Sequence, residues 1–208
     1  MKIARSIYQS NWQGKSLSKI DALMAKMPFS GVIDTFNWHE QYPTAPDTSF
    51  TLVHTDDILY VRFEVKGELP LATKMKDLEH VNEDACVEIF IANADNTRYW
   101  NFEFNAVGVC NASYRKSRKE DVVRLNVEQL QSIKRFPVHL CVAHWSLLVA
   151  IPFSLIELNL SCECARRANM YKCGDKTPIP HYVSWNPIHV DTPAFHLPEF
   201  FGEIRFTE

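Results

Sequence analysis

The chain has 208 residues, of which 46% are hydrophobic and 23% charged, and its formal net charge is −3. This composition is typical of a folded globular protein and excludes a disordered chain. The length suffices for one well-packed domain, so we expect a single domain over residues 1–208. The absence of a basic run argues against nucleic-acid binding, and no apolar run approaches the roughly 20 residues of a membrane span.

The compartment is predicted from the N-terminus and the cysteines. The first residues contain no uninterrupted apolar stretch of signal-peptide length. Six cysteines can form three disulfides in a secreted protein, but a domain of this size does not need them. Cys86, Cys110 and Cys141 lie in apolar, strand-like segments, where a free cysteine behaves as a small hydrophobic residue. We therefore expect a cytoplasmic chain with free thiols, or a secreted or periplasmic one if a leader has been removed.

Residues 16–27 predict a short N-terminal helix. Ser18 can cap its start, Asp21 follows three residues later, and Pro28 ends it. The residues that share its apolar face are Ile20, Leu23, Met24 and Met27. A helix this short is expected to pack on a β domain rather than to organise it.

From residue 50 onward, apolar and polar residues alternate with a period of two, which indicates half-buried β-strands. The predicted strands are 50–54, 58–65, 86–91, 99–105, two strands within 138–151, a short strand within 169–175, and a last strand at 204–206. Residues 55–57 form the turn of a hairpin between the first two. We predict an all-β fold, an antiparallel β-sandwich of jelly-roll type with a short N-terminal helix.

The strand 99–105 separates two kinds of side chain most sharply. Its apolar face consists of Trp100, Phe102 and Phe104, which we expect in the core. Its other face consists of Tyr99, Asn101, Glu103 and Asn105. A row of polar groups on a strand is either solvated or a set of hydrogen-bonding partners for a ligand rich in hydroxyls.

Trp185 is the most informative single residue of the C-terminal part. Pro180 and Pro187 flank it, and prolines do not continue a β-ladder, so the ring is expected on or beside a loop. An aromatic ring beside the amide of Asn186 is suited to a sugar, whose apolar face stacks on the ring while its hydroxyls need polar partners. The alternative is that Trp185 plugs one end of the core.

Five motifs in the same order resemble the family 9 carbohydrate-binding modules, in the branch of small stand-alone proteins of Bacteroidetes-type bacteria. They are VNEDACVEIFI at 81–91, YWNFEFNAVG at 99–108, NxYKCGD at 169–175, PHYxSWNPI at 180–188 and FHxPEFFG at 195–202. Separated motifs in the right order are more specific than any single short pattern. The resemblance implies a β-sandwich that binds carbohydrate, with contacts from two neighbouring strands and the late tryptophan loop.

The resemblance also assigns candidate binding residues. It implies that Trp185 stacks on a sugar, and the residues expected to bond hydroxyls are Glu88, Glu103, Asn105, Asn186 and His181. Asn82 stands where the family has a second tryptophan that completes an aromatic clamp. A site with one ring is expected to bind at least about tenfold more weakly than a site with two.

Three chemistries other than sugar binding are considered. Cys162, Cys164, Cys173 and His181 supply four zinc-type ligands, but their spacing is not that of paired zinc knuckles, so we predict no metal. Met170 with His181 makes a haem-binding redox module conceivable, although we predict no cofactor. Glu88 and Glu103 are a carboxylate pair of the kind that glycoside hydrolases use.

His196 could be read as a catalytic base. It has no accompanying serine or cysteine nucleophile motif, so we expect it to hold its loop in place by hydrogen bonding.

The sequence thus predicts a non-catalytic protein that binds a sugar or an oligosaccharide end. The alternative is a partner-binding or scaffold domain that keeps the fold without binding sugar. The missing signal peptide and the Asn82 departure both favour that alternative, because polysaccharides are mostly outside the cytoplasm.

Overall fold

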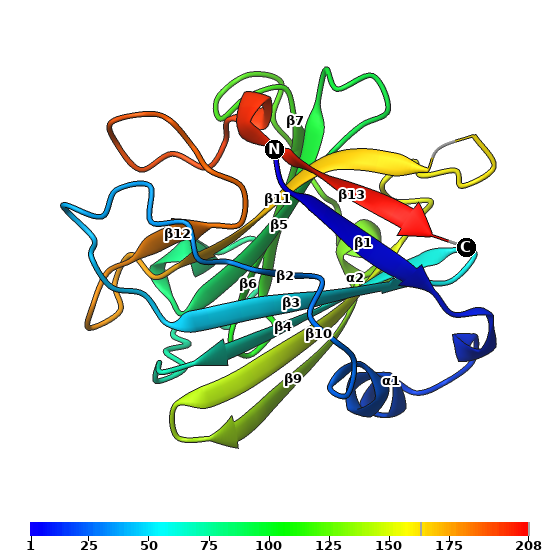
Figure 1. Cartoon of the computed structure of the whole chain (residues 1–208), viewed down its shortest axis with the longest axis horizontal. Helices are drawn as coiled ribbons and strands as arrows, with labels where there is room; N and C mark the ends of the chain where they lie inside the picture. Colours follow the sequence, from blue (N-terminus) through cyan, green and yellow to red (C-terminus); the bar gives the residue numbers. More distant parts are fainter. Residues whose placement is uncertain (163, 208) are drawn as a thin grey trace.

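A curled β-sheet forms most of the molecule in the computed structural model, which describes residues 1–162 and 164–207 (Figure 1). The strands are β1 (Ile3–Tyr8), β2 (Gly31–Val32), β3 (Asp47–His54), β4 (Ile58–Lys66), β5 (Cys86–Ala92), β6 (Tyr99–Asn105), β7 (Cys110–Arg115), β8 (Val123–Arg124), β9 (Lys134–Cys141), β10 (His144–Pro152), β11 (Ala165–Cys173), β12 (Tyr182–Ser184) and β13 (Gly202–Thr207). The α-helices are α1 (Leu17–Met24) and α2 (Val127–Ser132), and single 3₁₀ turns occur at Ser10–Trp12, Val81–Glu83 and Pro198–Phe200.

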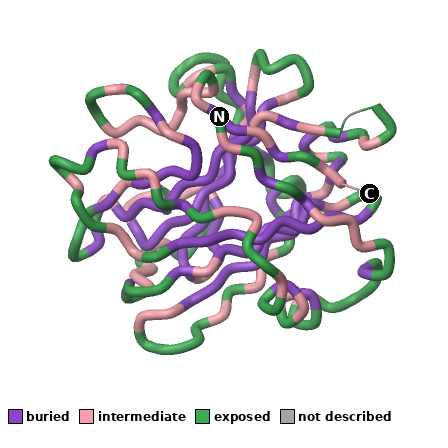
Figure 2. Tube along the Cα trace, viewed as in Figure 1, coloured by how far each residue is buried: buried purple, intermediate pink, exposed green. Residues whose placement is uncertain are grey.

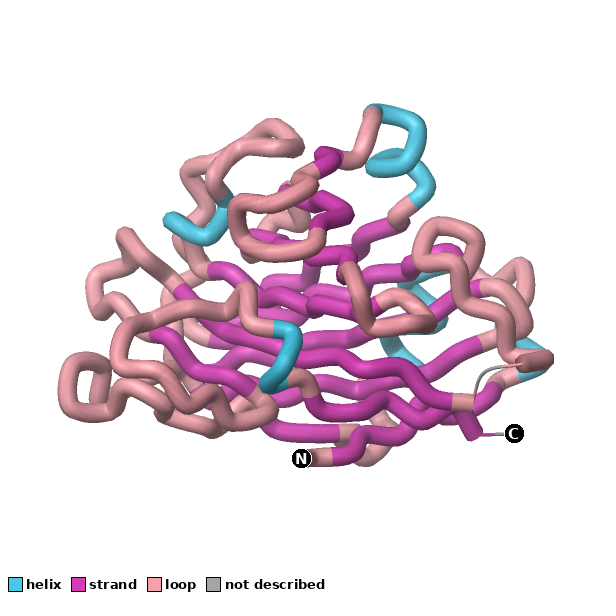
Figure 3. The backbone as a smooth tube through the Cα atoms, turned by 90° about the horizontal axis from the view of Figure 1, so that it is seen from above, coloured by secondary structure: helices cyan, strands magenta, loops and turns pink. Residues whose placement is uncertain are grey.

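The strand order is β8-β7-β6-β5-β11-β13-β1-β3-β4-β10-β9, with β12 added to β11 and β2 added to β3. Most neighbours are antiparallel, as predicted, but β1 runs parallel to both β13 and β3. A parallel pair needs a long crossover, and residues 9–46 supply it between β1 and β3. Seen from above, the strands run across the middle of the molecule and loops surround them (Figure 3).

The core lies between the two halves of the curled sheet, which therefore form the two layers of a β-sandwich. On one side it contains Val87, Ile89 and Ile91 of β5 with Trp100, Phe102 and Phe104 of β6. On the other it contains Phe50 and Leu52 of β3, Val61, Phe63 and Val65 of β4, and Leu147 and Val149 of β10. Figure 2 shows the buried strands in the interior and the exposed segments in the surrounding loops. The predicted alternation of residues 99–105 is confirmed.

Helix α1 packs on the outer face of the β4–β10 layer. Its residues Ile20 and Met24 are buried, and Asp21 accepts a hydrogen bond from Arg62 Nε at 2.8 Å. The predicted helix is confirmed, but its cap is Ser16 rather than Ser18, since the Ser16 side chain accepts from the amide of Lys19. Ser18 lies two residues further along, inside the helix, so it is not placed to cap the first free amides.

The sequence did not predict β1, β2, β7, β8, β12 or helix α2. The short sequence of β7 mixes small, polar and aromatic residues, so it shows little period-two signal. Helix α2 begins with a capping box, in which Asn126 and Gln129 bond each other's backbone amides. That pattern is readable in the sequence, but six residues are too few to show helical periodicity.

Every cysteine in the described part of the chain is free. Cys86, Cys110 and Cys173 are buried, and Cys86 and Cys110 behave as predicted. Cys141 is exposed, because it ends β9 at the edge of the sheet, so its predicted burial is wrong. Within residues 1–162 and 164–207, none of the helices combines the length and apolar character that crossing a membrane requires.

We expect the stability of the fold to fall when the pH falls from 7 to 4, in part because of His54. Its ring is 2% exposed, Nδ1 lies 3.0 Å from Ser6 Oγ, and burial lowers its pKa to about 4, against partial opposition from Asp56. Between that value and an unfolded pKa near 6.5, the unfolded chain binds the proton and the native chain does not. Because solvent screening reduces the effect of this pKa shift, we expect His54 to contribute about 1–2 kcal/mol of pH-dependent stability.

Urea unfolding at several pH values checks this expectation. The His54→Gln variant should show a flatter pH dependence than the wild type, and the control His39→Gln, which replaces an exposed histidine, should follow the wild type. Equal slopes in the wild type and His54→Gln would contradict the assignment.

Candidate functional site

A pocket of about 310 Å³ lies on the outer face of β5, β6, β7 and β11, away from the core. Its lining residues are His80, Asn82, Glu88, Glu103, Asn111, Arg115, Arg118, Arg124, Cys173, Asp175, Tyr182, Pro193, Ala194, Phe195 and His196. The strand alternation that sends Phe102 and Phe104 to the core sends Glu103 to this pocket. Of the predicted polar face of residues 99–105, Glu103 is thus the residue that lines the pocket.

Two glutamates from neighbouring strands lie side by side in the pocket lining. Glu88 of β5 stands directly opposite Glu103 of β6 in the ladder. Glu103 accepts hydrogen bonds from Asn101 Nδ2 at 2.8 Å and from Asn111 Nδ2 at 2.9 Å. Burial raises the pKa of Glu88 well above its ordinary value, with Cys173 and Glu103 adding to the effect. Burial also raises the pKa of Glu103, although the two amide partners oppose the shift.

Arginines line the β7 side of the pocket. Arg115 is 9% exposed, and its Nη1 donates to the carbonyl of Arg118 at 3.1 Å. Its Nε has no hydrogen-bond partner among the described residues. Because a guanidinium has five N–H donors, Arg115 retains donors for a ligand in the pocket. Arg118 and Arg124 are exposed at the rim.

Aromatic side chains form the opposite side of the pocket. The Phe195 ring stacks on Tyr171 with centroids 4.3 Å apart and planes 11° apart. Tyr182 lies with its ring centroid 6.2 Å from that of Phe195 and is held edge-on by Tyr42. His196 Nδ1 lies 3.0 Å from the Tyr99 hydroxyl, in hydrogen-bonding range. His196 therefore ties its loop to β6, as predicted, and also lines the pocket.

Asn82 lies at the pocket with its amide already paired. Its Nδ2 donates to Asp175 Oδ2 at 2.8 Å, and the Asp175 amide donates to the Asn82 carbonyl at 2.9 Å. These bonds join the turn before β5 to the turn after β11. Asn82 therefore lines the pocket with a polar side chain, at the position where the resemblance noted in the sequence implies a second tryptophan.

The prediction that Trp185 offers an open ring for stacking is wrong. The side chain is 3% exposed, belongs to the core and meets Phe50 edge-on with centroids 5.6 Å apart. A Cβ built on Gly31 would lie 3.0 Å from Trp185 Nε1, and one built on Gly202 would lie 2.7 Å from its Cζ3. The indole is enclosed on several sides. The alternative reading, a plug in the core, is the correct one.

Asn186 and Asn105 are buried structural residues and do not line the pocket. Asn186 Nδ2 donates to the carbonyl of Phe200 at 2.6 Å, and its Oδ1 accepts from the backbone amide of Lys2 at 2.7 Å. Asn105 Nδ2 donates to Asp84 Oδ2 at 2.9 Å and to the Lys74 carbonyl at 2.9 Å. Their predicted role as sugar ligands is therefore wrong, since backbone and carboxylate partners already use these amides.

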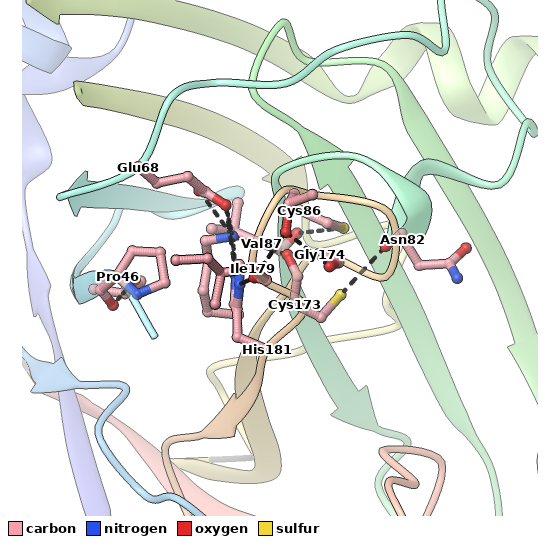
Figure 4. A network of polar contacts seen from close by, with 12 residues as sticks. Pro46, Glu68, Asn82, Cys86, Val87, Cys173, Gly174, Ile179 and His181 are labelled. Carbon is pink, nitrogen blue, oxygen red and sulfur yellow. Dashed lines mark hydrogen bonds and ion pairs between the residues drawn. The ribbon is translucent and has the colours of Figure 1, made fainter. Parts of the chain in front are cut away.

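His181 belongs to a buried ionic group instead of the pocket (Figure 4). Its Nε2 lies 2.8 Å from Lys172 Nζ, and its Nδ1 lies 2.8 Å from the Ile179 carbonyl. Lys172 Nζ also contacts both carboxylate oxygens of Glu68, at 3.0 and 3.1 Å. Burial, followed by the charge of Lys172, lowers the pKa of His181 to about 3. These contacts fit a neutral His181 ring whose Nε2 accepts a hydrogen bond from the Lys172 ammonium. Because both ring nitrogens have partners inside the protein, the predicted sugar contact of His181 is also wrong.

The four candidate zinc ligands that the sequence offered differ in their surroundings. Cys162 and Cys164 are exposed, whereas Cys173 and His181 are buried. Among the described residues, the potential metal-binding group is instead Cys86, Glu88 and Cys173.

The haem alternative has no support in the geometry. Met170 packs in the core, and both ring nitrogens of His181 have hydrogen-bonding neighbours. Neither side chain is therefore free to ligate iron.

Most residues of the pocket wall were not predicted from the sequence. They include Asn111, Arg115, Tyr182 and Phe195. They come from segments that are far apart in the chain, so no local spacing connects them. The motif FHxPEFFG at 195–202 could have indicated an aromatic residue of the pocket. It contains three phenylalanines, however, and only the structure shows that Phe195 is the one that lines the pocket.

Comparison with solved structures supports the fold. A candidate carbohydrate-binding protein from Bacteroides uniformis is 29% identical, with a TM-score of 0.88 and 99% of both chains covered. A family 9 carbohydrate-binding module from Caldicellulosiruptor kristjanssonii in complex with cellotriose is 13% identical, with a TM-score of 0.68 and coverage of 99% of this chain and 93% of that one. Such a module from the same organism in complex with glucose is 14% identical, with a TM-score of 0.61 and coverage of 99% and 96%.

Comparison with curated proteins gave no significant match. The model of the family described as Carbohydrate-binding family 9 matches residues 18–206, which is most of the chain. The chain therefore belongs to carbohydrate-binding family 9.

Proposed function

We propose that this protein binds a sugar or the end of an oligosaccharide in the pocket on the outer face of β5, β6, β7 and β11. One observation carries the proposal: the pocket joins aromatic rings on one side to carboxyl, amide and guanidinium groups on the other. A sugar ring presents an apolar face and a rim of hydroxyls, so it needs both kinds of partner at once. The family match and the relatives in complex with cellotriose and glucose support a carbohydrate as the ligand.

Each side chain has a distinct role in this proposal. Arg115 and Asn111 donate hydrogen bonds to hydroxyl oxygens, and Glu103 accepts from hydroxyl groups. Tyr182 and Phe195 take the stacking role that the sequence assigned to Trp185. The volume of about 310 Å³ is at the low end for ligand pockets, which favours a single sugar or a chain end over a long internal segment.

The proposed activity is binding without catalysis. Carbohydrate-binding modules are a non-catalytic type of domain, and the chain belongs to such a family. Both oxygens of Glu103 already accept hydrogen bonds from asparagine amides. A glycoside hydrolase needs one carboxylate free for the sugar carbon or its attacking water. The pair Glu88 and Glu103 therefore suits recognition of hydroxyls better than hydrolysis.

Removal of the aromatic side of the pocket is expected to weaken sugar binding about tenfold. Phe195→Ala and Tyr182→Ala each delete a ring whose contact with a sugar contributes on the order of 1–2 kcal/mol. Titration calorimetry with glucose, xylose and short β-linked oligomers of each measures the affinity of the wild type and both variants.

Phe200→Ala is the matched control, because it removes a partly buried phenylalanine of the same segment that does not line the pocket. It should bind as the wild type does. Equal affinity in all four proteins would show that the sugar binds elsewhere on the molecule. No heat from any of these sugars would leave the alternative of a partner-binding domain that keeps the fold.

A further inference from the structure

Three potential metal ligands converge at one end of the pocket floor. Cys86 and Glu88 are two residues apart on β5 and thus point to the same face of the sheet. Cys173 of β11 stands directly opposite Cys86 in the adjacent ladder. Cys173 Sγ lies 3.2 Å from Glu88 Oε1, Cys86 Sγ lies 3.9 Å from the same oxygen, and the three ligand atoms all lie within 4.8 Å of one another.

We propose that Cys86, Glu88 and Cys173 bind a thiophilic divalent metal ion of the zinc type. This inference does not depend on sugar binding, since it uses the ladder register and the ligand distances alone. Figure 4 shows Cys86 and Cys173 beside Asn82 at this end of the sheet.

The distances fit tetrahedral coordination. With metal–sulfur bonds of about 2.3 Å and metal–oxygen bonds of about 2.0 Å, a tetrahedron places sulfur and oxygen ligands about 3.5 Å apart and two sulfurs about 3.8 Å apart. The observed sulfur–oxygen distances of 3.2 and 3.9 Å lie on either side of that value. Small rotations of the side chains therefore suffice to form the site, and the β-ladder holds the backbone in place.

The ligand set selects the kind of ion. Two sulfurs favour zinc, cadmium or copper(I), whereas calcium and magnesium require oxygen ligands. The three protein groups leave a fourth position, as zinc sites that bind a water or an external ligand do. Glu88 and Cys173 line the pocket, so the fourth position opens toward it.

Cadmium titration tests the proposal, because cadmium–sulfur bonds give an ultraviolet charge-transfer absorption. The parent protein carries Cys141→Ser, Cys162→Ser and Cys164→Ser, which remove the exposed thiols, and a phosphine reductant keeps the others reduced. We expect one equivalent of cadmium to bind and zinc to displace it. Further replacement Cys86→Ser or Cys173→Ser should weaken binding by at least about 100-fold, and Glu88→Gln by about tenfold or more.

Cys110→Ser is the matched control, since Cys110 is an equally buried thiol on β7 that lies outside the group. It should bind cadmium as the parent does. The proposal is overturned if the reduced, folded parent takes up no stoichiometric cadmium, or if Cys173→Ser binds as tightly as the parent. Should the serine variants fail to fold, X-ray absorption of the zinc-loaded parent decides the question. Two sulfur atoms are expected among the neighbours of the zinc ion, and a spectrum with fewer than two would refute the site.

Discussion

Replacement of Trp185 by alanine is expected to lower the free energy of unfolding by about 3–5 kcal/mol, the range for the loss of a buried large aromatic side chain. The indole is 3% exposed and contacts Phe50. Gly31 and Gly202 pack directly against the indole, and neither has a side chain that could move into the resulting cavity. Urea unfolding, followed by circular dichroism, measures the change.

A Trp185→Phe variant separates packing from recognition. It keeps an aromatic ring in the core, so its loss of stability should be clearly smaller than that of Trp185→Ala. Its affinity for sugar should equal that of the wild type, because the ring does not reach the pocket. Loss of binding in the stable, folded Trp185→Phe protein would restore the stacking role, and a loss of less than about 1 kcal/mol in Trp185→Ala would contradict the enclosed position.

The parts of the fold that the sequence predicted correctly depend on local alternation. In residues 99–105 the aromatic residues Trp100, Phe102 and Phe104 face the core and Glu103 faces away. Side chains of a strand must alternate, so the pattern within one strand determines its two faces without knowledge of the rest of the chain. The hairpin of β3 and β4 was predictable for the same reason.

The position of Trp185 could not be derived from its neighbours in the sequence. The prolines on either side indicate a loop but not the direction of the ring. That direction depends on the pairing of β12 with β11 and on the bridge between Thr35 and Ser184. Gly31 and Phe50, which enclose the indole, lie more than a hundred residues earlier in the chain.

The same limit explains which candidate site residues line the pocket. Glu88 and Glu103 follow from strand alternation, and Asn82 follows from the position of its motif just before β5. The side-chain amides of Asn105 and Asn186 could bond sugar hydroxyls, but they already donate hydrogen bonds to backbone carbonyls of other segments. Arg115 and Phe195 enter the pocket only because β7 and the last loop fold next to β5 and β6.

A second large effect is expected for Lys172→Met. The ammonium of Lys172 is fully buried and lies 3.0 Å from the carboxylate of Glu68, which is 8% exposed. Without the lysine, Glu68 loses its cationic partner and keeps only the His181 ring, whose Nε2 lies 3.5 Å from Oε1, and His181 loses its donor. Removal of one member of a buried ion pair costs about 3–5 kcal/mol, so chemical unfolding should show a loss of that size.

The double variant Lys172→Met/Glu68→Gln tests the electrostatic cause directly. It removes both charges and leaves an amide that can donate to His181, so it should be more stable than Lys172→Met alone. Lys116→Met is the control, because it breaks the exposed pair between Lys116 and Glu120, whose loss should change stability by less than about 0.5 kcal/mol. If the double variant is no more stable than the single one, the cost comes from lost packing of the lysine chain rather than from the unpaired carboxylate.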